Sequence, residues 1–288
     1  MNNDFTTYRQ KLGYSDKTIK TQNNQVKRFK NWCSDQNINP ERITYNQALQ
    51  FIDHERERGV LNQSIINQIN AIRIYFDYLQ ESGVIARNII KRIKIRRSAK
   101  KVLPETLTLQ QLEDLYQNFI NLPEWEHRSK KEKELHKRNI VLLGLLVYQG
   151  LTSGEVAKLE PNHINLMEGK IYIPSSRKGN ARTLRLQANQ ILPFKIYLEQ
   201  FTPKSCLFPT KKSCDMIGNI IKQAKKLEHK LRDCRQIRAS VIMNWLKTNN
   251  IRQVQYMAGH KRIKSTEHYR NQDLTDLSRQ LDLFHPLK

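Results

Sequence analysis

The sequence predicts a mainly α-helical protein with one small antiparallel β-sheet, divided into two domains. The chain has 288 residues, which is enough for about two domains of roughly 100–200 residues each. An apolar stripe with helical spacing runs through the first third, and a strand-like alternation of apolar residues appears after the middle. We expect a helical domain at residues 1–98, a basic linker at 99–106 and a second domain at 107–288.

The first domain is expected to be a bundle of about four short helices. Ser15 precedes a helical pattern over residues 16–32, and Thr44 with Gln47 forms a capping box that opens a second helix. A third helix carries one apolar stripe whose members are spaced by four and three residues in turn, and Gly83 ends it. The stripe consists of Ile65, Ile69, Ile72, Phe76 and Leu79.

The second domain combines helices with one hairpin. Thr108 and Gln111 form a further capping box, and residues 140–151 are apolar enough for a buried helix. Over residues 170–186 the period changes to two, and the Lys178-Gly179-Asn180 segment lies between the alternating stretches, which predicts a β-hairpin. From residue 217 onward the pattern is helical again.

The charge favours a polyanionic partner. Fifty Lys and Arg residues against 27 Asp and Glu give a net charge of +23. Such an excess is typical of nucleic-acid-binding proteins, although a ribosomal or generically basic protein has the same composition. A content of 38% hydrophobic and 27% charged residues fits a folded chain rather than a disordered one.

The sequence argues against a membrane or exported protein. The longest apolar run, residues 140–148, is about half the ~20 residues that a transmembrane helix needs. The N-terminus has neither the charged nor the apolar region of a secretory signal. The four cysteines form no CxxC pair and no zinc-binding pattern, so we expect reduced thiols and a cytoplasmic location.

A run of basic residues precedes Pro104. Seven of the eleven residues from 91 to 101 are Lys or Arg. Such a run is usually a solvated face or tail, but at a domain junction a linker that crosses a DNA backbone has the same composition, and the run alone leaves both interpretations open. The basic residues are Lys91, Arg92, Lys94, Arg96, Arg97, Lys100 and Lys101.

Four local patterns carry candidate chemistry, and each has an ordinary structural explanation. Lys178 sits at the hairpin tip, where most lysines are merely exposed. Arg235 and Arg238 share one helical face and are able to clamp a phosphate, or form a plain basic surface. His260 follows Gly259, and Tyr269 comes nine residues later; alone, neither residue type marks a catalytic group.

In this order the patterns resemble the catalytic domain of the tyrosine recombinase (phage integrase) family. That family has Gly-Leu-Arg-x-Ser-Glu, a hairpin Lys, His-x-x-Arg, Leu-Gly-His and then a Tyr nine residues on. This sequence has Gly-Leu-Thr-Ser-Gly-Glu at 150–155, Lys178, Arg-Gln-Ile-Arg at 235–238, Ala-Gly-His at 258–260 and Tyr269. Residues 14–19 and 64–79 resemble the family's N-terminal SAM-like core-binding domain, so the resemblance covers nearly the full chain.

The resemblance implies a two-domain, C-shaped clamp around duplex DNA and a metal-free, cofactor-free strand transfer. Tyr269 would attack the phosphorus and hold the DNA as a 3′-phosphotyrosine ester. Arg238 and His260 would stabilise the negative charge that grows on the phosphate oxygens. Lys178 would protonate the departing 5′ oxygen, and Arg177 beside it would contact DNA.

Two positions depart from the family pattern. Thr152 occupies the place of the first arginine and supplies no charge, and Arg235 occupies the place of a His or Lys. We expect Arg235 to compensate in part for Thr152, with Arg177 and Arg138 as weaker stand-ins. If nothing compensates, the chain is a catalytically degenerate relative that binds recombination sites and acts structurally or by competition.

The resemblance also implies partners. An amphipathic tail helix is predicted near the C-terminus from Leu274, Leu277, Leu281 and Phe284. In the family such a tail often docks onto a neighbouring protomer, and we favour this over a tail that folds back on its own domain. We therefore expect a homo-oligomer, a tetramer on double-stranded DNA. We also expect accessory DNA-bending proteins and a role in a mobile element. A generic basic nucleic-acid binder is the third alternative.

Overall fold

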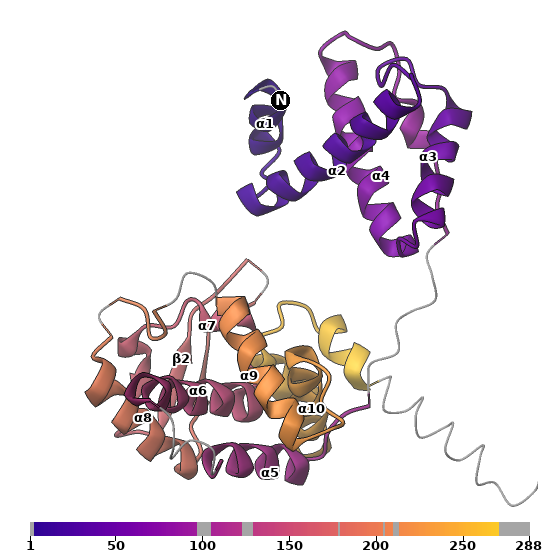
Figure 1. Cartoon of the computed structure of the whole chain (residues 1–288). Helices are drawn as coiled ribbons and strands as arrows, with labels where there is room; N and C mark the ends of the chain where they lie inside the picture. The colour runs from indigo at the N-terminus through magenta and orange to yellow at the C-terminus, as the bar shows by residue number, and fades with distance from the viewer. Residues whose placement is uncertain are drawn as a thin grey trace, which may run out of the picture. The chain divides into compact units, whose positions relative to one another are not determined.

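The computed structural model describes residues 3–96, 105–122, 129–177, 179–203, 205–209 and 213–270. It divides the chain into two compact units, Met1–Lys101 and Val102–Lys288, and each unit has its own hydrophobic core (Figure 1). The predicted fold class, mainly helical with a small antiparallel sheet, is confirmed. Over the described ranges, no helix combines the length and apolar character that crossing a bilayer requires.

Two helices of the first unit begin where the capping residues predicted. Ser15 accepts a hydrogen bond from the Thr18 amide, and Thr44 and Gln47 form the full capping box. The chain leaves α4 after Glu81, and Gly83 adopts a left-handed φ of 73°. The elements are α1 (Asn3–Lys11), α2 (Asp16–Asp35), α3 (Tyr45–Glu57), α4 (Asn62–Glu81) and the 3₁₀ turn η1 (Ile89–Arg92).

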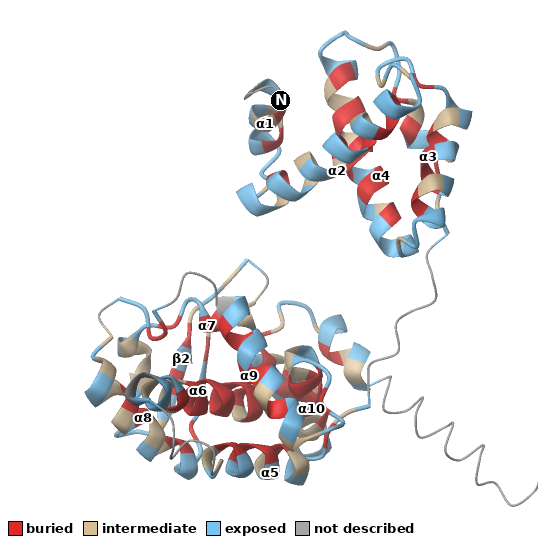
Figure 2. Ribbon diagram, in the orientation of Figure 1, coloured by how far each residue is buried: buried red, intermediate tan, exposed pale blue. Residues whose placement is uncertain are grey.

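The core of this unit forms where α2 meets α4. All five members of the predicted stripe on α4 are buried (Figure 2). They join Val26, Phe29 and Trp32 of α2 in one apolar cluster. The cluster gives α2 and α4 the burial that stabilises them, because most helix stability in proteins comes from packing an amphipathic face rather than from intrinsic propensity.

Helix α1 was not expected, because it holds few apolar residues. Its Arg9 is fully buried, and the guanidinium donates hydrogen bonds to the Ile19 carbonyl and to Asn23 Oδ1. The same guanidinium lies 3.9 Å from the centre of the Phe5 ring. Tertiary contacts of Arg9 and of the buried Phe5 therefore hold a helix that local apolar spacing does not predict.

The second unit is built around α6 (Lys130–Gln149). This helix packs against α5 (Leu109–Ile120), α8 (Ala188–Phe201), α9 (Ser213–Leu227) and α10 (Cys234–Thr248). Figure 2 shows α6 buried along most of its apolar half. The helix predicted over 140–151 in fact begins ten residues earlier, at Lys130, and ends two residues earlier, at Gln149. Ser129 and Glu132 form a capping box that begins the helix at Lys130, and Gly150 ends it with a left-handed φ of 58°.

The predicted hairpin is present, and its register matters for the site. Strand β2 (Lys170–Ile173) pairs with β3 (Arg182–Arg185), with Ile171 opposite Leu184 and Ile173 opposite Arg182. A short strand β1 (Ile164–Asn165), which the sequence pattern did not indicate, pairs with the other edge of β2. The sheet order is therefore β1-β2-β3.

The remaining helices of the second unit position the residues of the candidate site. Thr108 opens α5 with the predicted capping box. The short helix α7 begins after Thr152, and α11 ends at a left-handed Gly259. The elements are α5 (Leu109–Ile120), α7 (Ser153–Val156), the 3₁₀ turn η3 (Pro161–His163), α8 (Ala188–Phe201), α9 (Ser213–Leu227), α10 (Cys234–Thr248), α11 (Ile251–Ala258) and a helical stretch at 264–270.

Candidate active site

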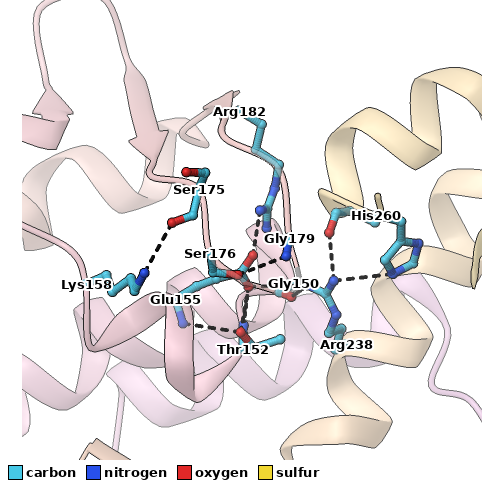
Figure 3. Close-up of polar contacts among 11 residues, drawn as sticks. Gly150, Thr152, Glu155, Lys158, Ser175, Ser176, Gly179, Arg182, Arg238 and His260 are labelled. Carbon is cyan, nitrogen blue, oxygen red and sulfur yellow. Dashed lines mark hydrogen bonds and ion pairs between the residues drawn. The ribbon is translucent and has the colours of Figure 1, made fainter. Parts of the chain in front are cut away.

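Arg238 projects from α10 and joins the ends of two other helices. Its Nη1 donates to the Gly150 carbonyl at 2.5 Å, and its Nη2 donates to the Ala258 carbonyl at 2.7 Å (Figure 3). Gly150 caps the C-terminus of α6 and Ala258 is the last residue of α11, where carbonyls lack helical partners. The side chain is 14% exposed. Because carbonyls are neutral, they fix the guanidinium without cancelling its charge.

Glu155 of α7 is a buried carboxylate that faces two guanidiniums. Its Oε1 accepts a 2.6 Å hydrogen bond from Arg182 Nη1, and its Oε2 lies 3.6 Å from Arg238 Nη1 (Figure 3). The Thr152 amide and hydroxyl both donate to Oε2 at 2.8 Å. Burial acts to raise the pKa of Glu155, but Arg182, Thr152 and Arg238 together outweigh it, and the net pKa is lowered. The carboxylate is therefore ionised at neutral pH.

His260 follows the left-handed Gly259 and turns its ring toward Arg238. Its Nε2 lies 3.5 Å from Arg238 Nη2, and its Nδ1 lies 2.9 Å from Thr266 Oγ1. Because a guanidinium only donates, we assign Nε2 as the acceptor and place the proton on Nδ1, which donates to Thr266. Burial, then the charges of Arg238 and Arg182, lowers the pKa of His260 to about 4. The imidazole is neutral at neutral pH.

Tyr269 stacks on His260 from the helical stretch at 264–270. The two rings are nearly parallel, at 8°, with their centroids 6.0 Å apart. Tyr269 also packs against the small apolar cluster of Ile242, Val254 and Ala258. Burial raises the pKa of the phenol, and the charge of Arg238 partly offsets the rise. Arg238, His260 and Tyr269, which the sequence motifs singled out separately, thus lie together.

The hairpin tip is attached to the His260 turn. Gly179 and His260 form an antiparallel bridge, and the Asn180 amide donates to the Gly259 carbonyl at 2.9 Å. Figure 3 shows Gly179 between Glu155 and the His260 turn. Lys178 itself lies outside the described residues. Its place in the sequence directly before Gly179 keeps it a candidate for this site.

The two departures from the motif are placed differently. Thr152 is the N-cap of α7, and its hydroxyl is bound to Glu155, so it contributes hydrogen bonds but no charge. Arg235 is exposed in the first turn of α10, and its amide donates to Asp233. Within the described part of the chain, no hydrogen bond or ion pair is found for its guanidinium. Compensation for Thr152 by Arg235 stays a prediction.

Of the other predicted cations in the second unit, neither Arg177 nor Arg138 forms a hydrogen bond or ion pair with the described residues of this cluster. Arg177 is exposed in the hairpin connection, and Arg138 on α6 donates to the Asn139 side chain. Lys91 forms a 2.7 Å ion pair with Asp77 in the first unit. Arg92, Lys94 and Arg96 are exposed there, and Arg97, Lys100 and Lys101 lie outside the described residues.

Arg182 is the residue of this site that sequence analysis missed. It is fully buried on β3, and its guanidinium packs against Gly259, where an added Cβ would overlap Nη1. A sequence signal for it existed. Leu184 and Leu186 alternate with polar residues, and the residue two positions before Leu184 shares their face because strand side chains alternate. A buried arginine requires a partner, which here is Glu155.

Comparison with known proteins gives the family. The model of the phage integrase family matches residues 105–275, more than half of the chain, and that of the phage integrase N-terminal SAM-like domain matches residues 4–83. The chain belongs to the phage integrase family of tyrosine recombinases. The resemblance inferred from the motifs is thereby confirmed, and the chain takes its place among the site-specific DNA recombinases.

Relatives of this tyrosine recombinase are distant but match over most of their length. A tyrosine recombinase of Thermosipho africanus (strain TCF52B) is 23% identical over 264 residues, 89% of each chain. The TnP I resolvase of Bacillus thuringiensis is 21% identical over 97% of this chain and 98% of its own. Among solved structures, a lambda integrase(75–356) dimer bound to a COC′ core site aligns over 92% of both chains with a TM-score of 0.68 at 16% identity. XerH bound to palindromic difH substrate aligns over 84% of this chain and 73% of its own, with a TM-score of 0.64 at 20% identity. These structures share the fold.

Replacing His260 with glutamine is expected to make the fold less sensitive to acid. The pKa of His260 falls from an ordinary 6.5 to about 4 in the folded chain. As pH falls through this window the unfolded chain takes up the proton first, so stability decreases from about pH 6.5 to about pH 4. Glutamine has no such titration. Melting temperatures across this window should therefore fall less steeply for His260→Gln than for the parent, and equal slopes would contradict the prediction. His229→Gln, at an exposed histidine, is the control.

Proposed function

We propose that this recombinase is catalytically active and cuts and rejoins DNA through a 3′-phosphotyrosine intermediate, in the integration or excision of a mobile element. One observation carries the proposal: the phenol ring of Tyr269 stacks on a neutral His260 whose Nε2 faces the carbonyl-fixed Arg238. This grouping combines a nucleophile, a proton acceptor and a cation. Strand transfer at a phosphodiester needs these three functions within reach of one phosphate.

The proposed step exchanges one phosphate ester for another. The Tyr269 oxygen attacks the scissile phosphorus, a new P–O bond to the phenol forms, and the bond to the 5′ oxygen breaks. Lys178 gives a proton to the departing 5′ oxygen, as the family resemblance implies. Religation is the reverse, with a 5′ hydroxyl attacking the phosphotyrosine ester. Because one ester replaces another, the cycle requires no ATP.

The protonation states support this direction of proton movement. Burial raises the pKa of Tyr269, so the phenol enters the reaction protonated. His260, with a pKa lowered to about 4, is unprotonated and able to accept a proton. A DNA phosphate bound beside the imidazole would stabilise its protonated form, since opposite charges attract more strongly where water is excluded. In the proposal, His260 takes the phenol proton as the tyrosine attacks, and Arg238 holds the phosphate oxygens.

Double-stranded DNA is the proposed partner. The net charge of +23 and the exposed Arg92, Lys94, Arg96 and Arg177 suit a phosphate backbone. We propose binding as a homo-oligomer, a tetramer at synapsis, with exchange of the tail helix and with accessory DNA-bending proteins. The predicted tail lies outside the described residues. The lambda integrase dimer on its core site and XerH on difH support this partner by likeness of fold.

A covalent-complex assay tests the proposed function. The parent protein is incubated with nicked suicide DNA, which loses the short 5′ fragment after cleavage and so traps the ester. We expect a protein–DNA adduct that survives denaturing detergent and that Tyr269→Phe abolishes, because phenylalanine lacks the attacking oxygen. Tyr256→Phe, at an exposed tyrosine on α11, is the matched control. If the parent forms no adduct on its own flanking DNA, or if Tyr269→Phe still forms one, the proposal fails.

Thr152 favours one alternative function. Its uncharged side chain caps α7 where the family motif has arginine. A chain without that charge is able to bind recombination sites and to occupy them without cleaving. This alternative predicts sequence-specific binding by both the parent and Tyr269→Phe, with no adduct from either.

A further inference from the structure

Arg182 is placed so that it acts on the charge of the site without lying on its surface. It points from β3 toward Glu155, opposite Ile173 of β2, with its side chain fully buried (Figure 3). The guanidinium also lies directly against Gly259, the residue before His260. The guanidinium of Arg182 therefore contacts both the Glu155 carboxylate and the turn that carries His260.

Glu155 lies closer to the guanidinium of Arg182 than to that of Arg238. The contact with Arg182 Nη1 is 2.6 Å, a charge-assisted hydrogen bond, whereas the contact with Arg238 Nη1 is 3.6 Å. Counting formal charges, Arg182, Arg238 and Glu155 sum to +1. Without Arg182, the charges of Glu155 and Arg238 would cancel, and these two residues would have no net positive charge to offer a phosphate.

The hydrogen bonding of Arg182 is unlike that of a residue selected only for stability. Its Nε and Nη2 are buried and find no acceptor among the described residues. Buried donors without acceptors are unfavourable, and an apolar side chain of similar size would avoid that cost at this position. The arginine thus brings a buried positive charge to the site at the expense of folding free energy.

We propose that Arg182 is a positioning residue for strand transfer: it engages Glu155 and leaves Arg238 with an uncompensated positive charge for the DNA phosphate. This inference rests on the proposed function. In the same proposal, Arg182 supplies the positive charge that Thr152 does not provide. Thr152 donates its hydroxyl to the same carboxylate but adds no cation, and the buried guanidinium of Arg182 supplies one from the opposite side of Glu155.

The test uses variants that separate charge from shape. Arg182→Met fills a similar volume without charge, and Arg182→Lys keeps the charge. Arg182→Met/Glu155→Gln removes both charges of the pair and keeps the capping box, since glutamine serves at that position as glutamate does. Arg185→Met, on the exposed face of the same strand, is the control for net charge. Each protein is checked for cooperative thermal unfolding, and single-turnover cleavage of the nicked suicide DNA is measured at saturating protein.

We expect Arg182→Met to lower the cleavage rate by about tenfold or more, with the Kd for DNA changed by less than about twofold. Arg182→Lys should keep most of the rate, and the double variant should regain most of what Arg182→Met loses. A parent-like rate for Arg182→Met, or a folded double variant no faster than Arg182→Met, would overturn the inference. A parent without a Tyr269-dependent adduct would instead overturn the proposed function.

A second measurement does not depend on activity. The charged groups that act on the His260 ring are Arg238, Arg182 and Glu155, and its other neighbours are Tyr269 and Thr266. NMR titration of the His260 ring should give a higher pKa in Arg182→Met, because one positive charge is lost, and a parent-like pKa in the double variant. An unchanged His260 titration in a folded Arg182→Met protein would show that Arg182 does not set the charge of the site, and would refute the inference.

Discussion

Replacing Arg238 with glutamine is expected to slow DNA cleavage by about 10³-fold, the upper range for losing one donor that stabilises a transition state. Glutamine keeps hydrogen-bonding capacity but has no charge. In the parent, Arg238 is fixed by two carbonyls and keeps its positive charge beside His260 and Tyr269. Single-turnover cleavage of nicked suicide DNA measures the effect, and fluorescence anisotropy should give a DNA affinity close to that of the parent.

Two further variants define what the arginine contributes. Arg238→Lys keeps the charge but lacks the planar fork that reaches both Gly150 and Ala258, so we expect a rate between those of the parent and Arg238→Gln. Lys247→Gln removes one charge from the exposed last turn of the same helix and should leave the rate unchanged. A folded Arg238→Gln protein that cleaves within about threefold of the parent would contradict the role assigned to this residue.

Gly259→Ala is expected to destabilise the second unit by about 2 to 4 kcal/mol and to impair cleavage as well. The residue has a left-handed φ of 68°, where any side chain is strained. The new Cβ would also overlap Arg182 Nη1, and the guanidinium is unable to yield easily because Glu155 holds it at 2.6 Å. Moving it disturbs the ion pair and the His260 turn together. Chemical denaturation followed by circular dichroism measures the loss.

Gly218→Ala is the matched control for this prediction. Gly218 lies within α9, and an added Cβ there would meet nothing within 4 Å. Alanine at an unhindered helical position should stabilise the protein by roughly 0.5 to 1 kcal/mol. If Gly259→Ala proves as harmless as Gly218→Ala, the close packing between Arg182 and the His260 turn is wrong.

Sequence analysis succeeded where structure follows from local chemistry. The capping residues Ser15, Thr44 and Thr108 begin their helices as predicted, because a side chain that satisfies free amides acts within four residues. The stripe on α4 and the hairpin over 170–186 were found because helical and strand periodicity are properties of short segments.

It failed where tertiary contacts outweigh local pattern. Helix α1 depends on the buried guanidinium of Arg9, and the first turns of α6 are highly charged and carry no apolar period. The capping box of Ser129 and Glu132 marks the start of α6, but the sequence-based prediction did not include it. Strand β1 has two residues, too few for any periodicity to appear.

The candidate site was predicted in part for the same reason. Arg238, His260 and Tyr269 were found from their order along the chain, and the structure brings them together. The Arg182–Glu155 pair joins residues 27 positions apart, from β3 and α7, so no single local window contains it. Sequence analysis predicted Arg235, from its place in the motif, as the cation that offsets the uncharged Thr152, and that prediction stays open. The proposal for Arg182 depends instead on its long-range pairing with Glu155.

Mass spectrometry of the trapped adduct tests most directly whether the phenol of Tyr269 becomes esterified to DNA. Trypsin cleaves after Lys264 and Arg270, so digestion with trypsin and nuclease should release the peptide spanning 265–270. We predict that this peptide carries a nucleotide joined through its 3′ phosphate to Tyr269. Attachment at any other residue, or an unmodified 265–270 peptide from an isolated adduct, would contradict the account.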